Sequence, residues 1–209
     1  MTKVKICGIT NLEDALKIAD LAPDAMGFVF YKKSPRYITP LKAYGIIRQL
    51  PVDILKVGVF VDPKEKEARR TAKLCNLDML QFHGKESPRF CEKFAERKVI
   101  KAFRIRKNVK IEEILKYNTF AYLFDAFVKA KPGGTGKKFN WQLIKKLGDL
   151  KRPIFLGGGL NEKNIGKAIG LLGPEWVDVS SSVEIKPGRK NIEKARRFIQ
   201  AARSAYVTG

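Results

Sequence analysis

Short apolar runs alternate along this chain with segments in which apolar residues recur at helical spacing. Leu12, Ala15, Leu16 and Ala19 show the helical spacing near the start. The short runs are apolar at nearly every position, which is typical of parallel strands covered by helices. We therefore predict eight β-strands, at residues 4–7, 25–30, 55–61, 79–82, 99–103, 120–124, 154–156 and 176–179.

Polar residues mark where several helices should begin. Asn11 has an acidic partner three residues later, and Thr39, Asp62 and Ser87 are each followed by proline. Such residues cap a helix, and proline is favoured at the first helical position. Strands that alternate with helices predict a (β/α)8 barrel with parallel strands. An open doubly wound sheet is the alternative, although no G-x-G-x-x-G follows the first strand.

The chain has 209 residues and no Pro-, Gly- or Ser-rich linker, so we expect a single catalytic domain, residues 1–209. The apolar runs are far shorter than the roughly 20 residues that a membrane-spanning helix needs. The N-terminus begins directly with a strand pattern and lacks the apolar core of a signal peptide. We therefore expect a soluble cytoplasmic protein without a membrane partner.

The chain carries 42 basic and 21 acidic side chains, a formal net charge of +21. The basic residues are spread over nearly every predicted helix, which favours a solvated lysine-rich surface over a nucleic-acid groove. A positive field would also attract a small anionic substrate. The three cysteines and the single histidine have no metal-ligand or disulfide spacing, so we expect no metal and reduced thiols.

The last two predicted strands end in small residues. Gly158 and Gly159 follow one strand, and Ser180 and Ser181 follow the other. Without a Cβ, the glycine backbone can approach a phosphate closely, and Asn161 is placed to cap the next helix. A tight turn is the simpler interpretation of either stretch alone. In (β/α)8 barrels, however, the loops after strands seven and eight often bind phosphate, so we predict a phosphate site here.

In this fold the chemistry takes place at the carboxyl ends of the strands. The polar or reactive residues predicted there are Cys7, Arg36, Asp62, Gln81, His83, Arg104, Asp125, Asp178 and Ser180.

Three of these residues can do chemistry. Cys7 can pack as a small apolar group, but a basic site would lower its pKa and make the thiolate available as a base or nucleophile. Asp125 ends an apolar strand, where partial burial would allow it to act as a general acid, although it could also fix the next loop. Arg36 lies in a proline-stiffened loop and suits a carboxylate. His83 is treated as an auxiliary group, and the glycine-rich loop 126–139 as a lid.

Seven stretches, in order and over essentially the whole chain, carry a resemblance to the phosphoribosylanthranilate isomerase family. They are residues 4–10, 27–30 with 34–36, 57–61, 80–84, Asp125 with 133–137, 158–161 and 177–181.

The resemblance implies an Amadori rearrangement of N-(5′-phosphoribosyl)anthranilate in tryptophan biosynthesis, without metal or cofactor. By this resemblance Asp125 is the general acid and Cys7 the general base. Arg36 binds the anthranilate carboxylate, and Gln81, His83 and Asp178 line or orient the substrate. Gly158, Gly159, Asn161, Ser180 and Ser181 bind its phosphate. We expect a monomer or a homodimer whose partner is this small molecule.

One departure and two alternatives remain. Ser182 stands where the family usually has glycine, which puts a glycine-only conformation in doubt. The histidine-pathway aldose-to-ketose isomerase runs similar chemistry, but it typically has aspartate at the first strand's end, and its substrate carries two phosphates. A basic nucleic-acid-binding protein would leave Cys7 and Asp125 without a role.

Overall fold

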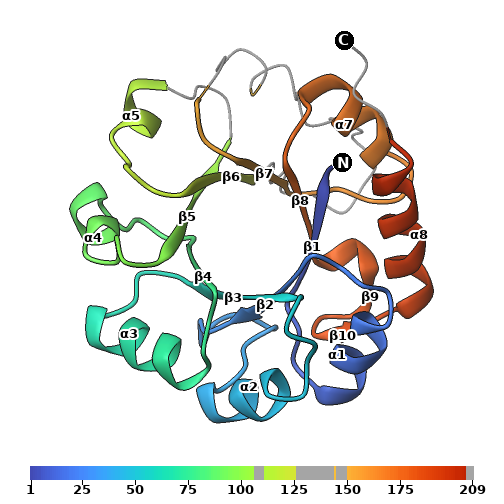
Figure 1. The fold of residues 1–209 in the computed structure, drawn as a ribbon, viewed down its shortest axis with the longest axis horizontal. Coiled ribbons are helices and arrows are strands. Elements are labelled where there is room, and N and C mark those ends of the chain that lie inside the picture. Colours follow the sequence, from blue (N-terminus) through green and yellow to red (C-terminus); the bar gives the residue numbers. More distant parts are fainter. Residues whose placement is uncertain (106–110, 126–143, 145–149, 206–209) are drawn as a thin grey trace.

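The computed structural model describes residues 1–105, 111–125, 144 and 150–205. Within these residues, parallel strands form a closed barrel in chain order, with β8 pairing back onto β1 (Figure 1). This confirms the predicted (β/α)8 barrel, and each predicted strand is present with ends that differ by no more than one residue. The strands are β1 (Lys3–Cys7), β2 (Ala25–Val29), β3 (Leu55–Phe60), β4 (Met79–Phe82), β5 (Lys98–Arg104), β6 (Ala121–Asp125), β7 (Ile154–Gly157) and β8 (Trp176–Val179).

Helices surround the barrel and cover the outer face of its strands (Figure 1). The described helices are α1 (Leu12–Ala19), α2 (Pro40–Ile47), α3 (Glu65–Leu74), α4 (Pro88–Glu92), α5 (Ile111–Leu115), α7 (Ile165–Leu172) and α8 (Ile192–Arg203). None of them is long and apolar enough to cross a membrane. The loop 126–139, predicted to be a lid, lies outside the described residues.

Three of the predicted helix caps are confirmed. The side chains of Asn11, Thr39 and Ser87 each accept a hydrogen bond from the backbone N–H three residues later. The prediction for Asp62 is wrong, because α3 begins three residues further on with Lys64 at its N-cap. The Asp62 carboxylate instead accepts a hydrogen bond from the Lys85 N–H at 2.6 Å, which ties the loop after β3 to the loop after β4.

Alternating side chains along each strand fill two separate cores. One set, which includes Phe28, Phe82 and Phe124, packs between the strands and the helices. The other set fills the barrel interior, where the rings of Phe155 and Trp176 stack with centroids 4.7 Å apart. A filled interior leaves room for a ligand only at the barrel mouth.

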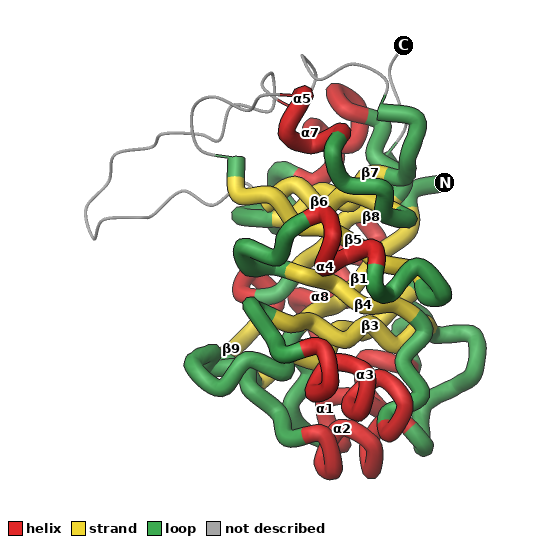
Figure 2. Tube along the Cα trace, turned by 90° about the vertical axis from the view of Figure 1, so that its left-hand side faces the viewer, coloured by secondary structure: helices red, strands yellow, loops and turns green. Residues whose placement is uncertain are grey.

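A short antiparallel hairpin follows β8 and was not predicted. After a 3-10 turn, η1 (Ser181–Val183), strand β9 (Glu184–Lys186) pairs with β10 (Arg189–Lys190). Figure 2 shows β9 on the side of the barrel where β6 ends and opposite the N-terminus, so the hairpin lies at the carboxyl ends of the strands. It brings Glu184 and Lys190 next to the mouth.

Candidate active site

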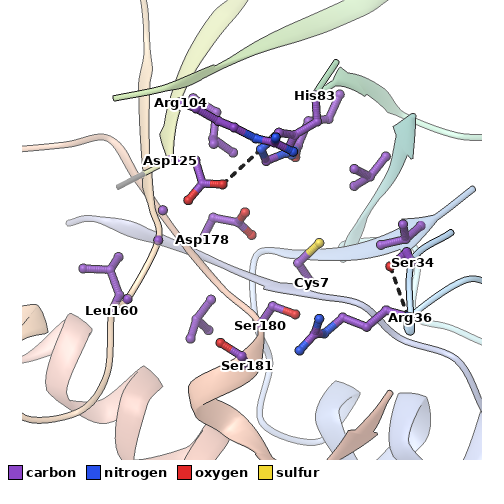
Figure 3. A pocket seen from close by; sticks show the side chains of 18 of the residues that line it. Cys7, Ser34, Arg36, His83, Arg104, Asp125, Leu160, Asp178, Ser180 and Ser181 are labelled. Atoms are coloured by element: carbon purple, nitrogen blue, oxygen red, sulfur yellow. Dashed lines mark hydrogen bonds and ion pairs between the residues drawn. The ribbon is translucent and has the colours of Figure 1, made fainter. Parts of the chain in front are cut away.

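A cavity of about 500 Å³ opens at the carboxyl ends of the strands. Cys7 from β1 and Asp125 from β6 both project into it (Figure 3). Around the barrel, β7 and β8 separate these two strands, so the glycine and serine turns lie between the thiol and the carboxyl group. Other residues that line the cavity are Arg36, Gln81, His83, Arg104, Gly158, Gly159, Asp178, Ser180 and Ser181.

Cys7 is held in a tight space beside β2. It pairs in register with Gly27, and a Cβ at that position would lie 2.6 Å from the Cys7 sulfur, so only glycine leaves room for the thiol. Burial raises the pKa of the Cys7 thiol, and the positive charge of Lys5 opposes this effect only in part. In the substrate-free protein, desolvation of the thiolate therefore outweighs the basic neighbours that could have lowered the pKa of Cys7.

Asp125 occupies the last position of β6, and its side chain is 20% exposed. Its Oδ2 lies 3.1 Å from Nε2 of His83, which stands just beyond the end of β4 (Figure 3). His83 Nδ1 lies 3.0 Å from the side-chain nitrogen of Gln81. The carboxyl group is therefore both open to the cavity and fixed by a neighbouring ring.

A fully buried lysine lies beneath the cavity. Lys5 Nζ lies 2.8 Å from Asp178 Oδ1 and 2.9 Å from Gln81 Oε1. Burial by itself would lower the pKa of Lys5, but Asp178 and Cys7 together outweigh burial, so the pKa is raised. We did not predict this residue. Strand alternation could have indicated it, since Lys5 is two residues before Cys7 and must face the same side of β1.

Arg36 reaches the cavity, but its guanidinium is already paired. Its Nη2 lies 2.6 Å from Oε2 of Glu184, and its Nε contacts both carboxylate oxygens. Its backbone N–H donates to the Ser34 hydroxyl, which fixes the loop (Figure 3). Lys190 Nζ lies 2.9 Å from the same carboxylate. Glu184 and Lys190 were not predicted as site residues, because they lie on the hairpin after β8, which was not predicted either.

The turns after β7 and β8 form one wall of the cavity. Gly158 and Gly159 have φ values of 78° and 69°, a left-handed conformation that glycine adopts without strain. The Ser180 hydroxyl is buried and has no hydrogen-bond partner among the described residues. Donors that remain free in this way suit an anionic ligand.

The structure does not place every predicted residue at the cavity. Asn161 lies outside it, and the prediction that Asn161 caps the next helix is wrong, since α7 begins at Ile165 after the N-cap Asn164. The Asn161 side chain instead accepts from the Lys163 N–H at 2.9 Å, in a turn that precedes the helix. Asp62 also does not line the cavity.

The described residues contain no group of three or more His, Cys, Asp or Glu side chains that could hold a metal ion. The cavity instead combines a thiol, a carboxyl group and anion-binding turns at the mouth of a (β/α)8 barrel. Fold and site together define a barrel enzyme with acid and base groups facing an anionic substrate.

Comparison with known proteins identifies the family. The model of the N-(5′-phosphoribosyl)anthranilate isomerase family matches residues 4–201. An N-(5′-phosphoribosyl)anthranilate isomerase of Geobacter sp. (strain M21) is 48% identical over 204 residues, covering 97% of this chain and 98% of the relative. The chain belongs to this family, which confirms the predicted activity, that of an N-(5′-phosphoribosyl)anthranilate isomerase in tryptophan biosynthesis.

Solved structures agree with this assignment. The crystal structure of phosphoribosyl anthranilate isomerase from Thermotoga maritima superposes with a TM-score of 0.90 at 43% identity, covering 97% of this chain and 99% of that one. A second such isomerase, solved with reduced 1-(o-carboxyphenylamino)-1-deoxyribulose 5-phosphate, has a TM-score of 0.88 at 41% identity, with coverage of 97% and 99%.

Proposed function

We propose that this enzyme rearranges N-(5′-phosphoribosyl)anthranilate with Asp125 as general acid and Cys7 as general base. The observation that carries the proposal is that both side chains project into one cavity (Figure 3). The glycine and serine turns line the same cavity, and they follow β7 and β8, which lie between β6 and β1. A phosphosugar bound in those turns would lie within reach of both groups. No metal or cofactor takes part in this scheme.

The two groups carry out two different proton transfers, one to the ring oxygen and one from C2′. Asp125 gives a proton to the ribose ring oxygen, the C1′–O bond breaks, and a protonated Schiff base forms with the anthranilate nitrogen. Cys7 then takes the proton from C2′, and the electron pair of that bond gives the enolamine. Tautomerisation yields the ketone, so protons balance and the reaction is a net isomerisation.

The raised pKa of Cys7 constrains when the thiolate forms. A positive Schiff base next to C2′ both acidifies the C2′ proton and stabilises a nearby thiolate. Each turnover starts from the form in which Cys7 is the thiolate and Asp125 carries the proton, and the proton that Cys7 takes from C2′ returns to Asp125 afterwards.

The two ends of the substrate require anion-binding groups. Arg36 is proposed to bind the anthranilate carboxylate, with Gln81, His83 and Asp178 lining the sugar. Gly158, Gly159, Ser180 and Ser181 are proposed to bind the phosphate, and the free Ser180 hydroxyl supports this role. Asn161 supports the turn from outside rather than contacting the ligand.

We further propose that residues 1–209 form one catalytic domain that works in the cytoplasm. The unpaired thiols of Cys7, Cys75 and Cys91 support a reducing compartment. For the oligomeric state, the prediction remains a monomer or a homodimer. One related structure is of monomers made from a dimeric isomerase of Thermotoga maritima. The prediction that nucleic acid is no partner also awaits a test.

A coupled assay tests the function directly. Purified protein is mixed with phosphoribosylanthranilate in the presence of a chelator, and loss of substrate fluorescence is followed. Turnover supports the proposal, and its absence contradicts it. The same assay with the histidine-pathway aldose substrate measures whether the chain discriminates between the two reactions.

A further inference from the structure

A continuous row of hydrogen bonds crosses the floor of the cavity. It runs from Lys5 Nζ to Gln81 Oε1 at 2.9 Å, from Gln81 Nε2 to His83 Nδ1 at 3.0 Å, and from His83 Nε2 to Asp125 Oδ2 at 3.1 Å. Lys5 and Gln81 are buried, while the other two residues are partly open to the cavity. The row therefore links the barrel interior to the proposed general acid.

The direction of every bond in this row follows from its first member. An ammonium group has only donors, so the Gln81 atom that faces Lys5 must be the amide oxygen. Lys5 donates to Asp178 as an ammonium group, and although burial lowers its pKa, Asp178 and Cys7 together raise it above its usual value. The Gln81 amide is thereby oriented, and its NH₂ group points at the imidazole.

The orientation of Gln81 fixes the histidine in turn. Because the amide NH₂ donates to Nδ1, that nitrogen must accept, and the ring proton must sit on Nε2. Nε2–H then donates to Oδ2 of Asp125. A carboxyl group held at one oxygen presents its other oxygen, Oδ1, to the cavity in a fixed position.

We propose that Lys5 and Gln81 are positioning residues that lock His83 in the Nε2–H tautomer, so that His83 orients Asp125 for proton transfer to the substrate. The inference rests on the proposed function only in its last step, because the tautomer is a property of the substrate-free protein. As the first member of the row, Lys5 is a buried cation whose charge is paired with Asp178.

The tautomer of His83 can be measured without overlap from other residues, since His83 is the single histidine of the chain. In ¹⁵N-labelled protein at pH 8, the imidazole nitrogen signals belong to this residue alone. Wild type is expected to show an unprotonated Nδ1 and a protonated Nε2. Free imidazole side chains also favour Nε2–H, so the decisive evidence comes from a variant that inverts the bond.

Gln81→Glu is that variant, because it preserves size but places a carboxylate oxygen against Nδ1. The Nδ1 signal is expected to move into the range of a protonated nitrogen. In the isomerase assay kcat should fall about tenfold or more, up to the roughly 10²–10⁴-fold that a general acid contributes, and any rise in KM should be smaller than the fall in kcat. Gln81→Met removes the donor without inverting the bond, so its loss of kcat should be smaller.

The controls separate positioning from packing. Gln49→Glu makes the same change at an exposed glutamine in the turn after α2, and it should alter neither the His83 signals nor kcat. A merely structural role predicts that the isosteric Gln81→Glu is milder than Gln81→Met. That ranking, or an unprotonated Nδ1 in Gln81→Glu, would overturn the proposal.

Two further outcomes are informative. A protonated Nδ1 with unchanged kcat would show that the tautomer does not serve Asp125, and would also overturn the proposal. If Gln81→Glu does not fold, the comparison of Gln81→Met with wild type decides, because unchanged kcat and unchanged His83 signals there contradict a lock. Wild-type protein that shows the locked tautomer but no turnover would instead contradict the proposed function.

Discussion

Arg36 and Glu184 form a two-pronged ion pair at the rim of the cavity, with Nη2 2.6 Å and Nε 2.9 Å from the two carboxylate oxygens. The Glu184 side chain is 3% exposed, and Lys190 contacts it from the other side. Burial alone would raise the pKa of Glu184, but Arg36 and Lys190 outweigh burial and hold it below its usual value. The pair therefore joins the loop after β2 to the hairpin after β8, and it orients the guanidinium.

Glu184→Gln should weaken substrate binding without touching the reacting atoms. The amide cannot pair both Arg36 nitrogens with a negative charge, so the guanidinium loses its fixed orientation. A hydrogen bond to a charged group contributes about 1.5–3 kcal/mol, so KM should rise about tenfold or more while kcat changes little. Steady-state kinetics measure both. An unchanged KM would show that Glu184 does not position Arg36.

Asp125→Asn and Cys7→Ser should each abolish most of the turnover. Each replacement keeps the shape but removes the proton donor or the base, so kcat should fall about 10²–10⁴-fold. Affinity for a non-reacting product analogue should stay close to wild type, as measured by calorimetry. Near-full activity of Cys7→Ser would exclude the thiolate as base.

Alkylation of Cys7 should be slow at pH 7 and accelerate as the pH rises. Burial raises its pKa, so little thiolate exists at neutral pH, and the thiolate is the reactive form. Cys75 and Cys91, with pKa values raised to about 11 and about 12, should react more slowly still because they are buried away from the cavity. Iodoacetamide labelling at pH 7 and pH 9.5, read by mass spectrometry, gives the rates. Fast labelling of Cys7 at pH 7 would show a lowered pKa instead.

Ser182→Gly should weaken binding at the phosphate end of the substrate. The Ser182 hydroxyl donates to the Leu160 carbonyl at 2.5 Å, which fastens the turn after β8 to the turn after β7. Loss of one hydrogen bond costs about 0.5–1.5 kcal/mol, so affinity for inorganic phosphate should fall about two- to tenfold. Competitive inhibition by phosphate measures this.

The matched control is Ser204→Gly at the exposed end of α8, which should leave phosphate inhibition unchanged. Tighter phosphate binding in Ser182→Gly would mean that serine crowds the site. Ser182 is not among the described non-glycine residues with positive φ, so its backbone has no need of glycine.

The fold could be predicted because its signals are local. Each strand shows as a short apolar run, and caps such as Asn11 and Ser87 act within one helical turn. Asp62 and Asn161 failed as caps for the same local reason: a capping side chain was present, but the helix began three or four residues later. A residue type indicates a turn more reliably than it indicates where the helix begins.

The site could be predicted only in part. Residues at the carboxyl ends of the strands, such as Cys7 and Asp125, lie around the same mouth in any closed parallel barrel. Their place at one cavity could therefore be predicted from the positions of the strands in the sequence. The pKa of Cys7 did not follow, since it depends on how completely the surrounding strands exclude water.

The sequence by itself determined the barrel, the family and the set of reactive groups at its mouth, because periodicity and motif order are written along the chain. Only the tertiary structure decided which charges meet. Lys5 with Asp178, and Arg36 with Glu184, are separated by 173 and 148 positions, so no local pattern pairs them. Closure of the barrel and the hairpin after β8 bring these charges into contact, and burial there sets their protonation.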